Sequence, residues 1–346
     1  MAVRVLVDAI HADLYQSLRL LFEHRFGWEL YRPYGMDWYT SGLWNFERQN
    51  LGDQVARQFL QPWGDDALGV GCWLRADVTH PGEAYRGVTL EQARELRPDL
   101  VISTLAENDA GLHAFAQEVG AHFGVQLGNQ GQPSRWDLAE FALLSTTTPE
   151  LPGGRPWMPH VFYRQEFSLE QFHADGGRLA EPDLVATRVQ CFTGTPDYAM
   201  FRQLAGELPQ LRFRWYGHCG EADELYGGNA MSTPQVAEQM HLARVAYHAK
   251  RWSDGYGHVI HGWAAIGRPL LVTADYYRGK LAEPLLEGSW NLEAHTVHET
   301  VKHLERLYED DEAWRLECIR VAQRFREVVD FDAEAEAIRA MLEAVL

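Results

Sequence analysis

The chain has 346 residues, a net charge of −18 and four cysteines. This length suits two domains of ordinary size, and a composition of 46% hydrophobic and 23% charged residues is that of a globular protein. The negative charge disfavours nucleic acid, since such a partner would need a local basic surface. No run approaches the roughly 20 apolar residues of a membrane span, and the first residues lack the form of a signal peptide. The absence of a Cys-x-x-Cys pair favours reduced thiols, so we expect a cytoplasmic protein without membrane insertion.

Short apolar runs alternate with helical patterns through the first 150 residues. This alternation predicts an α/β fold in which crossover units build a parallel sheet with helices on both faces. The predicted elements are strand Val3–Val7, helix Leu14–Phe26, strand Glu29–Tyr31, helix Thr89–Leu96, strand Asp99–Leu105, helix Asn108–His122 and strand Gly124–Leu127.

The proline- and glycine-rich segment Leu151–Pro159 predicts a connection between two domains. We place the N-terminal Rossmann-like domain at residues 1–160 and the C-terminal one at 161–330. We expect residues 331–346 to form a terminal helix that packs back on the N-terminal domain. The predicted elements after the break are strand Val189–Phe192, helix Pro196–Glu207, strand Leu211–Tyr216, helix Ser232–Leu242, strand Ala246–His248, helix Gly257–Ile266, strand Pro269–Val272 and helical structure from Thr296.

Two doubly wound domains of this kind bind ligands at the carboxyl ends of their strands. If the two sheets face each other, the ligand lies in a cleft between the domains. We therefore looked for chemistry in the residues that follow each predicted strand.

The segment after the strand Ala246–His248 has the features of a phosphate site. Gly255 and Gly257 let backbone N–H groups approach a ligand closely at the start of a helix, where the partial charge is positive. Lys250 and Arg251 lie just before them. Together these residues predict a seat for a diphosphate.

The order of motifs in the second half resembles the donor-binding half of the GT4-like retaining glycosyltransferases, which have the GT-B fold. The resemblance extends over roughly residues 185–280, and over residues 1–150 it is only architectural. The matching segments are Gln190–Gly194, Arg214–Gly217, Ser232–Glu238, Asp254–Ile260 and Ala264–Leu271.

The resemblance implies a hexosyltransferase that holds a nucleotide-diphosphate sugar, such as UDP-glucose, and moves the sugar to an unknown hydroxyl acceptor with retention. It implies no cofactor and no metal ion, and it makes Asp254 a catalytic candidate. The donor-binding candidates are His218, Lys250, Arg251, Gly255, Tyr256, Gly257, His258, Tyr277 and Lys280.

Two departures from the family pattern concern the donor. The second acid of the family's pair falls on Gly262, so the carboxylate expected to bind the ribose is missing. The family's Arg and Lys after the first strand of the domain are missing from Thr193–Met200. Arg278 is therefore a further candidate for phosphate neutralisation, beside Lys250, Arg251 and Lys280.

Polar residues also follow the strands of the N-terminal domain. His11 comes after the first strand, and Glu107 follows the strand that ends at Leu105; we predict both as catalytic candidates. We predict that the acceptor is bound by Asp109, Asn129 and Gln130.

Apparent metal motifs have simpler explanations. His258 and His261 lie three residues apart on one predicted helix, but no third ligand is evident. The sequence Asp330-Phe-Asp332 comes at the start of the terminal helix and is interpreted as a cap. We expect no metal site.

Three alternatives remain open for the function. One is a phage-type enzyme that glycosylates hydroxymethylated DNA bases. The second is a non-catalytic relative that binds nucleotide sugars, and the third is an epimerase of the same fold.

Overall fold

The computed structural model describes residues 2–8, 12–33, 62–65, 72–75, 84–104, 106–127, 135, 137–144, 154–161, 180–189, 192–217, 222–230, 232–251 and 257–346. The chain forms two compact units, and the first contains both ends of the chain. Unit 1 comprises Met1–Tyr163 and Phe331–Leu346, and unit 2 comprises Arg164–Asp330. The sequence analysis placed the corresponding boundaries at residues 160/161 and 330/331.

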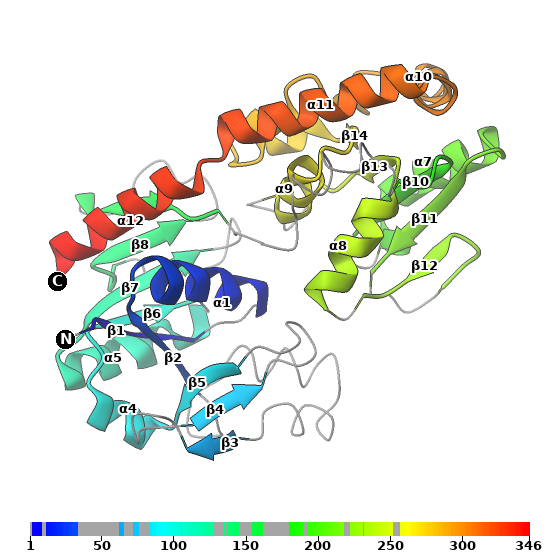
Figure 1. Cartoon of the computed structure of the whole chain (residues 1–346). Helices are drawn as coiled ribbons and strands as arrows, with labels where there is room; N and C mark the ends of the chain where they lie inside the picture. Colours follow the sequence, from blue (N-terminus) through cyan, green and yellow to red (C-terminus); the bar gives the residue numbers. More distant parts are fainter. Residues whose placement is uncertain are drawn as a thin grey trace. The chain divides into compact units, whose positions relative to one another are not determined.

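Unit 1 is built around a mostly parallel sheet in the order β3-β4-β5-β2-β1-β6-β7-β8-β9 (Figure 1). Only the pairs β3·β4 and β4·β5 are antiparallel among the described strands. The strands are β1 (Arg4–Val7), β2 (Glu29–Pro33), β3 (Pro62–Asp65), β4 (Cys72–Arg75), β5 (Ala84–Val88), β6 (Leu100–Ser103), β7 (His122–Leu127), β8 (Phe141–Leu144) and β9 (Trp157–Pro159).

Both faces of this sheet are covered, as the uninterrupted apolar strands require. Val5 and Val7 of β1 pack with α1 and α12 on one face, whereas Leu6 packs with α4 and α5 on the other. The helical segments are α1 (Ala12–Arg19), the π-helical continuation η1 (Leu20–Arg25), α4 (Leu90–Leu96), the 3₁₀ turn η2 (Ala106–Asn108), α5 (Asp109–Val119) and α12 (Phe331–Val345).

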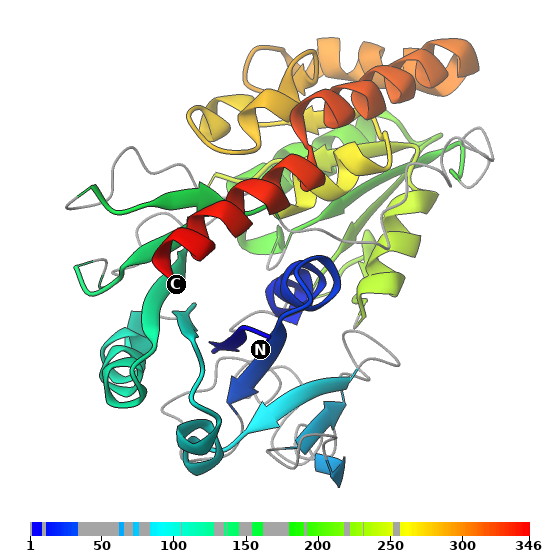
Figure 2. The same ribbon diagram turned by 60° about the vertical axis from the view of Figure 1, so that its left-hand side comes forward.

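The terminal helix α12 is part of unit 1. It packs against β9 (Figure 2), and Ile338 and Leu342 are fully buried in the core beside β1. Its first turn is tied to the residues after β9, because the backbone N–H of Val161 donates to Glu334 Oε2 at 2.8 Å. The chain leaves unit 1 after Tyr163 and re-enters it at Phe331. The hydrogen bond between Val161 and Glu334 therefore joins the two segments of unit 1 close to these crossings.

Unit 2 has a parallel sheet in the order β12-β11-β10-β13-β14-β15. The strands are β10 (Leu184–Arg188), β11 (Arg212–Tyr216), β12 (Tyr226–Gly228), β13 (Val245–His248), β14 (Leu270–Val272) and β15 (Trp290–Asn291).

The helices of unit 2 follow the strands in alternation, as expected for a doubly wound unit. Val245 and Tyr247 of β13 share a core with α7, α10 and α11, and α9 packs against α8 and β13. The helical segments are the 3₁₀ turn η4 (Phe192–Gly194), α7 (Pro196–Glu207), α8 (Thr233–Leu242), α9 (His258–Ala265), the 3₁₀ turns η5 (Ala274–Tyr277) and η6 (Glu283–Leu286), α10 (Val297–Glu309) and α11 (Asp311–Val328). None of the described helices is long and apolar enough to cross a membrane.

The predicted strand Val189–Phe192 is wrong. The strand is β10, Leu184–Arg188, in which every residue pairs with β11. Phe192 lies in the 3₁₀ turn beyond the strand and is fully buried, with its ring edge-on to those of Tyr198 and Phe201. Phe192 is therefore apolar because it is buried in a turn. The sequence analysis compared Gln190–Gly194 with the first strand of the family's domain, but Phe192–Gly194 is a 3₁₀ turn.

Candidate functional site

Each sheet has one point at which the order of connection reverses. In unit 2 the chain runs from β10 to β11 and β12 on one side and then returns to β13 on the other side of β10. In unit 1 the corresponding point lies between β1 and β6. Ligands of open α/β sheets bind outside the carboxyl ends of the strands at these points.

In unit 2, helix α9 begins beside the switch point. The residue at its start is Gly257, and a side chain fits poorly at this position. Gly257 has a φ of 74°, and a Cβ added to it would lie 2.4 Å from the Cβ of Ala282, which is fully buried. The N–H groups of the first helical turn have no acceptor within the helix and carry partial positive charge. The helix start therefore carries partial positive charge that can attract an anion, and contact of Gly257 with a diphosphate stays a prediction.

Arg251 follows β13 and joins the two loops on either side of the switch point. Its Nε lies 3.0 Å from Asp197 Oδ1 in the first turn of α7, and its Nη1 lies 2.8 Å from Glu293 Oε1. Asp197 is only 5% exposed, so it needs this cation. The arrangement gives Arg251 a structural role that the prediction of a phosphate contact did not include.

Lys250 is held at the same edge by its backbone. Its N–H donates to Thr273 Oγ1 at 3.3 Å, and its carbonyl accepts from the same hydroxyl at 3.2 Å. Thr273 directly follows β14, so this pair joins the carboxyl ends of β13 and β14. These contacts hold the main chain and do not depend on the side chain of Lys250.

Two predicted donor contacts lie in the interior of unit 2. Tyr277 has no exposed surface, and its hydroxyl lies 2.9 Å from Nε2 of His248, the last residue of β13. Lys280 is 7% exposed, and its Nζ lies 3.1 Å from the centre of the Tyr276 ring. Both side chains are therefore packed inside unit 2. Direct contact of either residue with a donor stays a prediction.

His258 and His261 both lie in the first turn of α9. His261 is 5% exposed, and its Nδ1 lies 3.0 Å from the carbonyl oxygen of Gly257, so it closes the first turn of α9. His258 is half-buried at the start of the helix. Among the described residues, no group of three or more His, Cys, Asp or Glu side chains is placed to hold a metal ion.

In unit 1 the switch point is bridged by Asp8, which follows β1 and is 2% exposed. Its Oδ1 accepts the backbone N–H of Thr104 at 2.6 Å, and its Oδ2 accepts Nδ2 of Asn108 at 2.6 Å. Burial raises the pKa of the Asp8 carboxyl to about 7, even though the hydrogen bonds from Asn108 and Thr104 act in the opposite direction. The sequence analysis did not predict Asp8 as part of a site.

Asp109, predicted to bind the acceptor, is engaged within unit 1. It is 1% exposed; its Oδ1 accepts from Ser103 Oγ at 2.6 Å and its Oδ2 from the backbone N–H of Arg135 at 2.7 Å. Both carboxylate oxygens thus serve the protein, which argues against a direct acceptor contact. The backbone of Glu107 lies in the turn η2, between Thr104 and Asp109.

Seven predicted residues lie outside the described residues, and the side chain of Glu107 does as well. Their roles stay predictions. They are His11, Asn129, Gln130, His218, Asp254, Gly255 and Tyr256.

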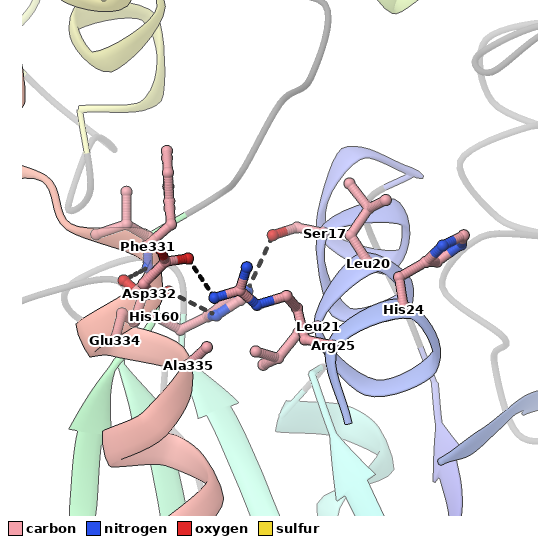
Figure 3. A pocket seen from close by; sticks show the side chains of 11 residues that line it. Ser17, Leu20, Leu21, His24, Arg25, His160, Phe331, Asp332, Glu334 and Ala335 are labelled. Atoms are coloured by element: carbon pink, nitrogen blue, oxygen red, sulfur yellow. Dashed lines mark hydrogen bonds and ion pairs between the residues drawn. The ribbon is translucent and has the colours of Figure 1, made fainter. Parts of the chain in front are cut away.

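A described pocket of about 310 Å³ lies elsewhere in unit 1, between η1 and the start of α12. Figure 3 shows Arg25 and Asp332 pointing toward each other across it, and these two side chains form an ion pair. His160 is buried behind them, with Nε2 3.3 Å from Ser17 Oγ. The pocket contains none of the predicted site residues.

Comparisons with known proteins show the fold. HepE from Anabaena, solved with UDP and glucose, superposes with a TM-score of 0.60 at 12% identity over 99% of this chain and 100% of its own. An α-glucosyltransferase solved with UDP and a 13-mer DNA containing an HMU base gives a TM-score of 0.63 at 8% identity, over 99% of this chain and 100% of its own. The chain has the GT-B fold. This confirms the predicted α/β class with two Rossmann-like domains.

The likeness does not extend to recognisable sequence relatives. No family model matches the chain, and no curated protein matches it at a significant level. The arrangement of the two GT-B domains across a cleft stays a prediction.

The sequence analysis missed the residues that bridge the switch points. Asp8 stands directly at the end of a strong strand, so its position was a usable signal. Asp197 and Glu293 are far from Arg251 in the chain and contact it only in the folded protein, so no local pattern predicted their role.

Proposed function

We propose that this protein is a glycosyltransferase that binds a nucleotide-diphosphate sugar, such as UDP-glucose, at the carboxyl edge of the sheet in unit 2. The observation that carries the proposal is the likeness over the whole chain to HepE structures that contain UDP, UDP and glucose, or UDP-glucose. The local structure supports it, since Lys250 and the start of α9 both follow β13, whose carboxyl end lies beside the switch point where such folds bind ligands.

In the proposed reaction the sugar leaves its diphosphate and is transferred to a hydroxyl group of the acceptor. Negative charge develops on the leaving diphosphate, and the N–H groups at the start of α9 with the Lys250 ammonium stabilise it. No metal ion is needed for this role in the proposal. His11, Glu107 and Asp254 are proposed to act on the sugar and the acceptor, with retention of configuration as the resemblance implies.

A second candidate is transfer to a hydroxymethylated base in DNA. The likeness to the α-glucosyltransferase bound to HMU-containing DNA favours it. The net charge of −18 opposes it, because DNA binding draws most of its affinity from cations that neutralise phosphates. We therefore propose a small-molecule, glycan or protein acceptor first.

A panel of nucleotide sugars tests the proposal. We expect UDP-glucose, at about 100 times its Kd, to raise the melting temperature by about 5 °C, and prolonged incubation to release UDP. Addition of duplex DNA with and without hydroxymethylated bases tests the second candidate through faster UDP release. Stabilisation without any turnover would favour a non-catalytic binding protein. Conversion of the nucleotide sugar in the absence of an acceptor would favour an epimerase. The proposal would be refuted if no nucleotide sugar stabilised the protein.

A further inference from the structure

The turn that follows β6 in unit 1 carries Glu107, one of the proposed catalytic residues. This turn begins at Thr104, passes through η2 and ends where α5 starts at Asp109. The position of this turn relative to β1 sets the position of the Glu107 backbone at the sheet edge. The residues that fix this turn therefore affect any reaction in which Glu107 takes part.

Asp8 holds both ends of the turn. Its two oxygens take one N–H bond each, from Thr104 at one end and from Asn108 at the other. Its own carbonyl oxygen also accepts the hydroxyl of Thr104. Since Asp8 and Asn108 are 100 residues apart in the chain, these bonds fix the turn to β1 across the switch point.

A buried carboxyl at this place is a costly way to join two loops. Asp8 is 2% exposed, and the carboxylate of Asp109 acts on it with a like charge that raises its pKa further. Burial of an ionisable side chain is costly, and such side chains cluster at functional sites.

We propose that Asp8 is a positioning residue that fixes the turn of residues 104–108 and, through it, the placement of Glu107 for sugar transfer. This rests on the proposed function. Asp8 itself has both oxygens occupied by protein donors, so it acts through the turn and not on the substrate.

Three variants separate positioning from general stability. Asp8→Ala removes both bonds, and we expect amide exchange of residues 104–110 to quicken at least about tenfold, with UDP release from UDP-glucose slowed by a similar factor. Asp8→Asn keeps the shape and one acceptor oxygen, and Asn108 can turn its amide over to meet it, so we expect most of the protection and most of the rate to return. Asn108→Ala removes one bond and tests the turn if Asp8→Ala does not fold.

The stabilisation by UDP-glucose provides the control, since the proposed donor site lies in unit 2. We expect it to be unchanged in all three variants, so that the rate falls at constant donor affinity. Unchanged exchange of residues 104–110 in both Asp8→Ala and Asn108→Ala would overturn the positioning role. If the wild-type protein neither binds nor hydrolyses UDP-glucose, the proposed function fails, and the exchange measurement still decides the role of Asp8.

The pH dependence of stability gives an independent check on the burial of this carboxyl. The folded-state pKa of about 7 lies above the ordinary value of 3.8, so the folded protein binds the proton more tightly. The stability that Asp8 contributes is therefore complete below about pH 4 and is lost as the pH rises through about 7. We expect the melting temperature of Asp8→Asn relative to wild type to rise between pH 5 and pH 8, and a constant difference would contradict the assigned environment.

Discussion

Replacement of Gly257 by alanine is expected to lower the free energy of unfolding by about 3 kcal/mol and to abolish stabilisation by UDP-glucose. The left-handed backbone at this residue costs a side chain about 1–2 kcal/mol. The remainder comes from overlap of the new Cβ with Ala282, 2.4 Å away in the fully buried interior. Relief of this overlap must move the start of α9, and the proposed diphosphate seat moves with it. Urea denaturation and a thermal shift with UDP-glucose measure the two effects.

Gly206→Ala is the matched control in the same unit. Gly206 lies in α7, and a Cβ there meets nothing within 4 Å, so alanine is expected to stabilise the helix by about 0.5–1 kcal/mol. Donor stabilisation should be unchanged in this variant. If Gly257→Ala left both stability and donor binding unchanged, this result would contradict the close packing of Gly257 against Ala282 at the start of α9.

Removal of the Lys250 side chain is expected to weaken the binding of UDP-glucose by about tenfold or more. A charge-assisted contact with phosphate contributes about 1.5–3 kcal/mol. The contacts between Lys250 and Thr273 use only the backbone of the lysine, so Lys250→Ala leaves them in place. Titration calorimetry measures the affinity, and chemical denaturation measures the stability.

Arg251→Ala should behave differently, because its guanidinium is the partner of Asp197. We expect a loss of about 1–2 kcal/mol of stability, reduced from the value for a fully buried pair because the Arg251 side chain is 48% exposed. Lys302→Ala, an exposed cation on α10, controls for the change in net charge. Wild-type affinity for UDP-glucose in Lys250→Ala would exclude this lysine from the donor site.

The central strands could be predicted from the sequence because burial on both faces gives them continuous apolar runs. Leu100–Ser103 and Leu270–Val272 were both found in this way, within one or two residues of their ends. The edge strands were missed, since Trp157–Pro159 and Trp290–Asn291 are short and only partly buried. Their strand character comes from pairing with a neighbour and leaves little pattern in the chain.

For the site, local backbone chemistry was predictable and long-range pairing was not. The start of a helix at Gly257 could be predicted from the motif itself. The ion pair between Arg251 and Asp197 joins residues 54 positions apart, and it turns a residue predicted to contact phosphate into one that also holds two loops together. The hydrogen bonds of Asp8 are of the same long-range kind.

Amide hydrogen exchange with and without saturating UDP-glucose tests the central claim most directly, because it locates the donor without any mutation. We predict that protection concentrates in residues 249–260 and 273–280, at the carboxyl ends of β13 and β14. Protection confined to the pocket of unit 1 around residues 160–161 and 331–335, with none at the start of α9, would contradict the proposed site.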